Sequence, residues 1–146
     1  MKLVNYLTKD YGKGNDYGLL ILRIVAGLVI FYGHGIEKIQ MLFSGQEIQF
    51  LDPIGIGGTT SFFLAFFAEA ICAILLIVGL FTRWSALILS INFLVILFFH
   101  GFVAKDGFQV LEARFLYMMG YVVIMLLGPG KISVDYLLFK NKNAIG

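Results

Sequence analysis

Four long apolar stretches alternate with short polar segments along the chain, at about residues 17–36, 60–80, 84–102 and 110–128. Each approaches the roughly 20 residues that a helix needs to cross the hydrocarbon core of a bilayer. Helix is expected because a segment in lipid must satisfy its own backbone hydrogen bonds. The pattern therefore predicts an all-α integral membrane protein, with a four-helix up-down bundle as the single domain of residues 1–146.

The boundaries of these stretches carry residues that start or end helices. The turn Phe81-Thr82-Arg83 joins the second stretch to the third, and Gly128-Pro129-Gly130 ends the fourth. Beyond it, Ser133 is positioned to cap a short amphipathic helix over residues 134–139 at the membrane surface. A second surface helix is expected over residues 1–11.

The loop over residues 41–58 is irregular but apolar. Asp52-Pro53 and the glycines that follow exclude a continuous helix there. Because most of its other residues are hydrophobic, we expect this loop to fold back over the mouth of the bundle. A free surface loop is the alternative.

Positive charges predict the orientation. Loops that face the cytoplasm carry an excess of Lys and Arg. Seven such residues would lie on the side of both termini, against Lys38, Lys105 and, if it is counted as loop, Arg114 on the other side. We therefore expect a multi-pass protein of the bacterial inner membrane with both termini cytoplasmic. The seven are Lys2, Lys9, Lys13, Arg83, Lys131, Lys140 and Lys142.

Composition agrees with a membrane domain and narrows its chemistry. Hydrophobic residues make up 60% of the chain and charged residues 14%, against about 25% charged in soluble domains. The net charge of +2 gives no reason to expect a nucleic-acid partner, so the bilayer is the first partner. Cys72 is the only cysteine, which excludes an internal disulfide or a C-x-x-C pair and favours a packing role. The sequence shows no motif for a covalently bound cofactor.

Six ionisable side chains interrupt the apolar stretches or lie at their edges. A charge within the hydrocarbon layer costs about 3 kcal/mol or more, so such residues normally face the interior and serve a function. In the predicted orientation, most of them gather toward one mouth of the bundle in the outer leaflet, and Glu69 lies about 15 Å below it, at 1.5 Å per residue. The six are Arg23, His34, Glu69, His100, Glu112 and Arg114.

Different roles are expected for these residues. Glu69 and His100 are the candidate proton-handling pair, because burial can adapt a carboxyl and an imidazole to proton transfer. The candidate ligand-binding residues are Arg23 and His34 on one helical stripe, Glu112 at the mouth, and Lys38, which is expected at the rim beside Glu37. Arg114 points away from Glu112 and is set aside.

Structural alternatives remain open for five of them. Glu112 and Arg114 can be interfacial residues at the end of a helix, and Glu69 can belong to a structural ion pair. Arg23 can extend to the lipid headgroups or pair with Glu69. His34 followed by Gly35 can instead be the end of a helix, where a cation suits the helix dipole.

A metal site is a further alternative. Two imidazoles and three carboxylates form a ligand set suited to iron, manganese or zinc. The Glu-x-x-His repeat of di-iron bundles is missing, so we expect no metal. The residues of this alternative set are His34, Glu37, Glu69, His100 and Glu112.

The chain resembles the DoxX family of small four-helix membrane proteins. The resemblance rests on LILRIVAGLVIFYGHGIEK from Leu20 to Lys38, the mid-span Glu69, the turn from Gly79 to Arg83, and His100. Glu112 and the Gly-Pro-Gly end of the fourth stretch also match. The family takes its name from a small subunit of a terminal quinol oxidase linked to thiosulfate:quinone oxidoreduction. The resemblance therefore implies a quinone connection and the same candidate site residues.

Three functions follow from these observations. The first is an accessory subunit or partner in quinone-linked redox chemistry, an oxidoreductase subunit without autonomous activity, whose outer-leaflet pocket holds a small ligand such as a quinone. The second is a non-catalytic assembly subunit of a larger membrane protein complex. The third, a small transporter, is disfavoured because the inner halves of the second and fourth stretches carry almost nothing polar.

Overall fold

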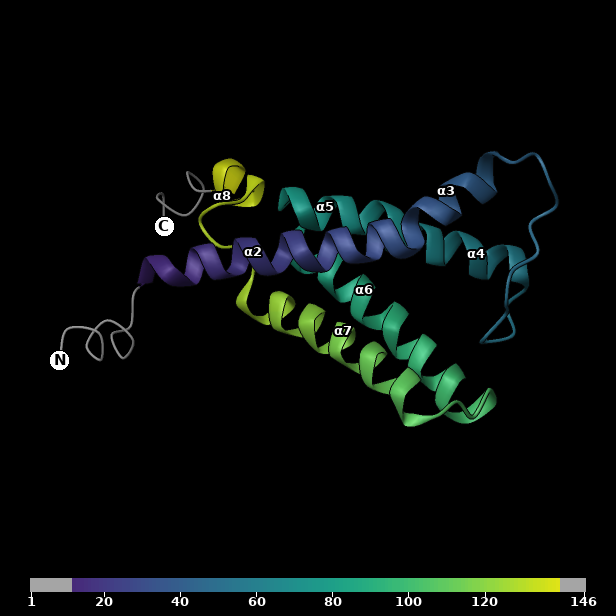
Figure 1. The fold of residues 1–146 in the computed structure, drawn as a ribbon. Coiled ribbons are helices and arrows are strands. Elements are labelled where there is room, and N and C mark those ends of the chain that lie inside the picture. The colour runs from purple at the N-terminus through teal and green to yellow at the C-terminus, as the bar shows by residue number, and fades with distance from the viewer. Residues whose placement is uncertain (1–11, 140–146) are drawn as a thin grey trace.

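Four helical spans and one short helix make up the computed structural model, which describes residues 12–139 (Figure 1). All four spans are long and apolar enough to cross a membrane, so the predicted four-span, all-α architecture is confirmed. The surface helix predicted over residues 1–11 lies outside the described residues. Span 1 consists of α2 (Gly12–Ile30), η1 (Phe31–Gly35) and α3 (Ile36–Phe43); span 2 of α4 (Gly58–Phe66), η2 (Phe67–Cys72) and α5 (Ala73–Val78); span 3 of α6 (Thr82–Phe98) and η3 (Phe99–Val103); span 4 of α7 (Phe108–Leu127); and α8 (Val134–Phe139) follows.

The predicted end of the fourth span is confirmed, but the turn between spans 2 and 3 lies earlier than predicted. It comprises residues 79–81, since Thr82 and Arg83 already belong to α6. Gly79, with φ of 77°, ends α5, and the N–H groups of Gly79 and Leu80 both donate to the carbonyl of Leu75 at 2.9 Å. This is the usual way in which a left-handed residue closes a helix. At the end of α7, Gly128 has φ of 87°. The hydroxyl of Ser133 accepts a hydrogen bond from the N–H of Tyr136 at 3.1 Å and so caps α8 as expected.

Span 1 is longer than the hydrophobic pattern predicted. The helix continues past Gly35, which has helical φ and ψ of −66° and −45°, and ends only at Phe43. The alternative that His34 and Gly35 end a helix is therefore wrong. Gly35 serves a different purpose, because a Cβ there would lie 2.6 Å from the carbonyl oxygen of Glu69. Glycine lets span 1 cross span 2 at close range.

The spans diverge toward one end of the molecule (Figure 1). Gly12 and α8 lie at one end, called here the terminal end, and the loop over residues 44–57 lies at the other, called the loop end. Toward the loop end, α6 and α7 stay together but separate from α3 and α4. The hydrophobic core draws residues from all four spans, among them Ile30, Leu76, Leu89 and Tyr121. Cys72 is buried in this core, as its packing role requires.

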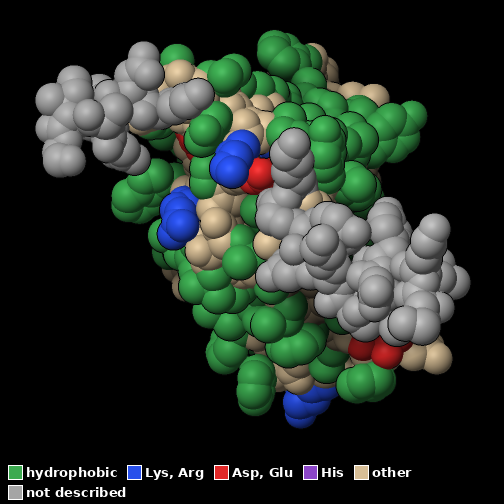
Figure 2. Space-filling model, turned by 90° about the vertical axis from the view of Figure 1, so that its left-hand side faces the viewer, with side chains coloured by type: hydrophobic (Ala, Val, Ile, Leu, Met, Phe, Trp, Pro, Cys, Tyr) green, Lys and Arg blue, Asp and Glu red, His purple; other side chains and the backbone are tan. Residues whose placement is uncertain are grey.

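The outer surface is that of a membrane protein. Figure 2 looks at the terminal end and shows hydrophobic side chains over most of the visible surface, with few charged groups between them. Large apolar side chains such as Leu28, Leu94 and Leu126 are exposed on three different spans. Lipid covers such surfaces in a bilayer, where no driving force buries them against protein.

Candidate functional site

Glu69 lies at the centre of a polar cluster between three spans. Its Oε2 is 2.6 Å from Nζ of Lys38 on α3, and the two side chains are only 5% and 8% exposed. Its Oε1 accepts a hydrogen bond of 2.8 Å from Nδ2 of Asn92 on α6. Glu69 therefore pairs with Lys38 and not with Arg23. Because Lys38 is buried beside Glu69, the prediction that it lies at the rim is wrong. Both carboxylate oxygens have a partner, so the charge of Glu69 is matched within the membrane.

Lys38 also contacts the loop. Its Nζ lies 5.5 Å from the centre of the Phe50 ring, within the range of a cation–π interaction. Phe50 in turn packs edge-on against Phe62 of α4, with ring centres 5.6 Å apart. Lys38 therefore connects the buried ion pair directly to the loop.

A cavity of about 550 Å³ lies between spans 2 and 3 beneath the loop. Its polar lining comes from Glu69, Asn92, Ser61 and His100, and the rest of its wall is apolar and partly aromatic. Five loop residues cover it, so the prediction that the loop folds back over the bundle is confirmed. We call residues 50–56 the lid; its cavity-lining members are Phe50, Leu51, Pro53, Ile54 and Ile56.

Asp52 holds the lid in shape. Its carboxylate accepts hydrogen bonds from the N–H groups of Ile56 at 3.0 Å and Gly57 at 2.8 Å, and from the hydroxyl of Ser61 at 2.9 Å. These donors favour the charged form, and the N–H of Gly57 contributes most to lowering the pKa of Asp52 below its usual value. The lid is thus fixed to the first turn of α4 by an ionised carboxylate.

His100 lines the cavity, and its ring contacts Asp106. Nδ1 of His100 lies 2.5 Å from Oδ2 of Asp106, and the backbone N–H of Asp106 donates to the carbonyl of His100 at 2.9 Å. Such a carboxylate fixes the orientation of the imidazole ring. His100 faces the cavity while Asp106 is partly exposed at the surface, so the pair connects the two.

Each of the two proton-handling candidates lies in a π-helical turn. Glu69 belongs to η2 and His100 to η3, and the third such turn, η1, contains His34. π-helical turns are rare and occur often at functional sites, because the extra residue changes which side chains face the neighbouring helix. The structure thus brings Glu69 and His100 to one cavity, as the sequence predicted.

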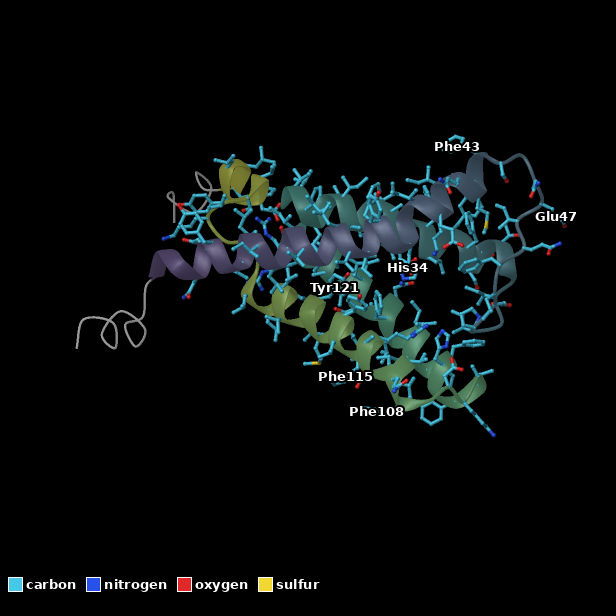
Figure 3. All side chains as sticks on the ribbon, in the orientation of Figure 1. His34, Phe43, Glu47, Phe108, Phe115 and Tyr121 are labelled. Carbon is cyan, nitrogen blue, oxygen red and sulfur yellow. The ribbon has the colours of Figure 1, made fainter. Side chains whose placement is uncertain are left out.

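Other predicted site residues lie outside this cavity. His34 and Glu37 are exposed, and Figure 3 shows His34 projecting from span 1 on the side where α7 lies. Glu112 is exposed and lines a separate groove of about 740 Å³ between η3 and α7, together with Phe108 and Phe115. Among residues 12–139, no group of three His, Cys, Asp or Glu side chains is close enough to hold a metal ion, so the alternative metal set does not assemble.

Arg23 lies at the terminal end. Its guanidinium is fully buried and donates from Nη2 to the carbonyl of Ile132 at 2.5 Å, so it reaches neither the headgroups nor Glu69. Both structural alternatives for Arg23 are therefore wrong. Gly79 is required beside it, because a Cβ there would overlap Nη1. Arg23 joins α2 to the segment that leads into α8.

Sequence reasoning missed two partners of the site. Asn92 was recognisable only as a polar residue in an apolar span, and its contact with Glu69 depends on the wider turn η2. Asp106 precedes Gly107, from which α7 starts, and was not distinguished from an ordinary turn residue. The sequence signal that could have indicated this pair is the short separation of six residues between His100 and Asp106.

Comparison with known proteins shows which family the chain is similar to. The sequence model of the DoxX family matches residues 18–101, which include Lys38, Glu69, Asn92 and His100. An uncharacterized protein of Haemophilus influenzae is 33% identical over 139 residues, covering 90% of each chain. A second uncharacterized protein of that organism is 32% identical over 133 residues, covering 88% of this chain and 96% of its own. No solved structure matches.

Proposed function

The chain belongs to the DoxX family, and from that premise we propose that it is an accessory membrane subunit in quinone-linked redox chemistry. In this role its cavity holds the ring of a quinone or quinol. The electrons pass to or from a partner subunit, since the chain's single cysteine and lack of a cofactor motif give it no redox group of its own. The excess of Lys and Arg beside the termini supports a loop end that faces outward from the bacterial inner membrane.

The chemistry of the cavity lining carries this proposal. Ligand sites are largely apolar with a few polar groups that fix orientation. Here Phe50, Phe67 and Phe99 supply aromatic surface, while Asn92 and His100 supply polar groups on different parts of the wall. An amide nitrogen has two hydrogens, and Asn92 gives one of them to Glu69. The second suits a quinone carbonyl.

Proton handling follows from the same arrangement. Oxidation of a quinol to a quinone releases two protons and two electrons, and reduction takes them up. His100 accepts a proton from the quinol hydroxyl and Asp106 stabilises the resulting imidazolium. Glu69 is the second proton-handling group, held in place by Lys38 and Asn92. The electrons leave to the partner subunit.

Quinone binding tests this function. The purified protein in lipid nanodiscs is titrated with decylubiquinone, and binding is compared between wild type and His100→Phe. We expect His100→Phe to weaken binding by about tenfold, because one hydrogen bond to a charged or polarised group contributes about 1.5 kcal/mol. The matched control is His34→Phe, whose side chain lies outside the cavity, and it should bind like wild type. Absence of binding to the wild type would contradict the proposal.

An assembly role is the second candidate, and it is supported by the outward face of α7. A Cβ on Gly120 would meet no atom within 4 Å, so this span presents a small residue to its surroundings. Small residues let two membrane helices approach closely. Gly120→Leu should then release a partner protein during purification from the native membrane, while quinone binding is retained. If Gly120→Leu leaves the purified complex intact, this candidate fails.

A further inference from the structure

We propose that the cavity opens sideways into the bilayer through a slot between α4 and α6, while the lid closes it from water. Its occupant is then a membrane-dissolved molecule with a neutral head and an apolar tail that extends through the slot. The nature of the head rests on the proposed function, whereas the slot follows from the geometry of spans 2 and 3.

The length and direction of the cavity support the slot. Its wall on span 3 extends from Ile88 to His100, and these twelve steps correspond to about 18 Å along a helix at 1.5 Å per residue. The hydrocarbon core of a bilayer is about 30 Å thick. The cavity is therefore a groove that runs along the helices through much of the membrane, and it is not a shallow pit at the aqueous end.

The two edges of this groove are exposed at membrane depth. Leu64 on α4 is 55% exposed and Ile91 on α6 is 52% exposed, and both line the cavity. Between them the wall of the groove includes the small residues Ala65 and Ala68. Figure 1 shows α6 diverging from α4 toward the loop end. A side chain that is exposed at this depth faces lipid, so the open edge of the groove meets hydrocarbon chains.

The lid closes the other opening. A Cβ on Gly58 would lie 2.7 Å from the carbonyl oxygen of Phe50, which shows how closely the lid is pressed onto the start of α4. Asp52 and the Phe50–Phe62 contact hold it there. The lid therefore covers the approach to Glu69 over the start of α4, and a water-soluble ligand that entered there would have to displace it.

The balanced charge of the Lys38–Glu69 pair favours a ligand with a neutral head group. Lys38 already matches the carboxylate of Glu69 at 2.6 Å, so the floor offers no free cation for a phosphate. An anionic phospholipid head would lie against the carboxylate and lose its own hydration, which is costly in a low-dielectric site. A ring with carbonyl or hydroxyl groups finds hydrogen-bond partners in Asn92 and His100. A tailed quinone satisfies both conditions.

Fluorescence quenching tests the slot without any ligand. Trp84, the only tryptophan, is replaced by Phe, and Val95→Trp places a reporter in the cavity lining. The neighbouring Leu94→Trp, exposed and outside the cavity lining, is the matched control for lipid contact. The proteins are reconstituted in vesicles of phosphatidylcholine with brominated acyl chains, and acrylamide is the aqueous quencher. Ile96→Trp, also in the lining, serves if Val95→Trp does not fold.

We expect brominated chains to quench the cavity reporter to within about a factor of two of the control, because acyl chains that enter the slot lie in contact with the reporter as they do with the control. Acrylamide should leave the cavity reporter almost unchanged. Quenching by acrylamide would overturn the proposal because it means that the cavity opens to water. Lack of quenching by the brominated chains would overturn it because the slot is then closed.

Tail dependence connects the slot to the quinone. Leu64→Trp should narrow the slot and weaken binding of decylubiquinone by about tenfold while changing binding of a tailless ubiquinone analogue by less than about twofold, because only the tail loses buried apolar contact. Leu94→Trp should change neither. If the two quinones respond equally to Leu64→Trp, the tail does not use the slot. If neither quinone binds the wild type but the brominated chains quench, the proposed function fails and the slot remains.

Discussion

Lys38 and Glu69 form a buried ion pair with 2.6 Å between Nζ and Oε2, joining span 1 to span 2 inside the membrane. The pair explains how a carboxylate can lie in the middle of an apolar span. It also fixes the floor of the cavity, since Asn92 holds the other carboxylate oxygen at 2.8 Å. The proposed quinone site depends on these three side chains keeping their arrangement and their balanced charge.

Removal of one member of the pair should be costly. Lys38→Met leaves the carboxylate of Glu69 buried without its cation, and we expect a loss of about 3–5 kcal/mol in the free energy of unfolding. Replacing both members, in Lys38→Met with Glu69→Gln, should restore most of that loss, because no buried charge remains. The measurement is unfolding by denaturing detergent in mixed micelles.

The control for this pair is an exposed one. Lys131 lies 4.0 Å from Asp16, with its side chain 69% exposed, and Lys131→Met should change the free energy of unfolding by less than about 1 kcal/mol. Equal effects of Lys38→Met and Lys131→Met would show that the buried pair does not hold spans 1 and 2 together.

Two neighbouring glycines should respond differently to alanine. Gly35→Ala places a Cβ 2.6 Å from the backbone carbonyl of Glu69, which cannot move aside easily, so we expect a loss of about 1–3 kcal/mol. Gly33→Ala meets no atom within 4 Å and should be neutral or stabilising by up to about 1 kcal/mol, from helix propensity. Thermal unfolding in detergent measures both. A mild Gly35→Ala would contradict the close crossing of spans 1 and 2.

The lid should loosen in acid. The pKa of Asp52 is held below its usual value of 3.8, mainly by the N–H of Gly57. A lowered pKa means that the stabilisation is fully present above about pH 4 and is lost as the pH falls through the lower, folded-state value. Hydrogen exchange at the amides of Ile56 and Gly57, corrected for its intrinsic pH dependence, should therefore show protection at neutral pH that disappears in acid.

The matched variant for the lid is Asp52→Asn. The neutral amide accepts the N–H hydrogen bonds less strongly, so the same amides should lose most of their protection already at neutral pH and show little further change in acid. Persistent protection in Asp52→Asn would mean that Asp52 does not hold the lid.

The terminal end should behave independently of the cavity. The carboxylate of Asp135 accepts hydrogen bonds of 2.8 Å from the N–H groups of Phe81 and Thr82 and so attaches α8 to the turn before α6. Asp135→Asn weakens this attachment, and we expect a cost of about 1 kcal/mol, similar to the loss of a helix cap. Proteolysis near α8 should become faster while decylubiquinone binding is unchanged. A parallel loss of quinone binding would connect the two ends.

Hydrophobic patterning was sufficient for the spans, the turns and α8, because each depends on local signals such as the glycines after α5 and α7. It was also sufficient to place Glu69 and His100 at one cavity. It failed for Lys38, which was expected at the rim and is buried. A regular 100° projection cannot follow span 1 beyond Phe31, where η1 inserts a π-helical turn and changes the direction of every later side chain.

Arg23 shows a second limit of the sequence. Arg23 itself faces inward, whereas His34 on the same helical stripe is exposed. The partner of Arg23 is the carbonyl of Ile132, 109 residues later in the chain. Such a contact depends on where the chain returns after α7, and no local pattern reports that. The same holds for Asn92, whose contact with Glu69 requires the register between spans 2 and 3.

Photoaffinity labelling can show whether the cavity between spans 2 and 3 holds a quinone ring. An azido-quinone is activated in native membranes containing the tagged protein, and the labelled residues are mapped by mass spectrometry. We expect labels on the cavity lining, at positions such as Phe67, Asn92 and Phe99, that disappear when excess decylubiquinone is present. Labels confined to the outward face of α7, or labels that decylubiquinone does not displace, would contradict it.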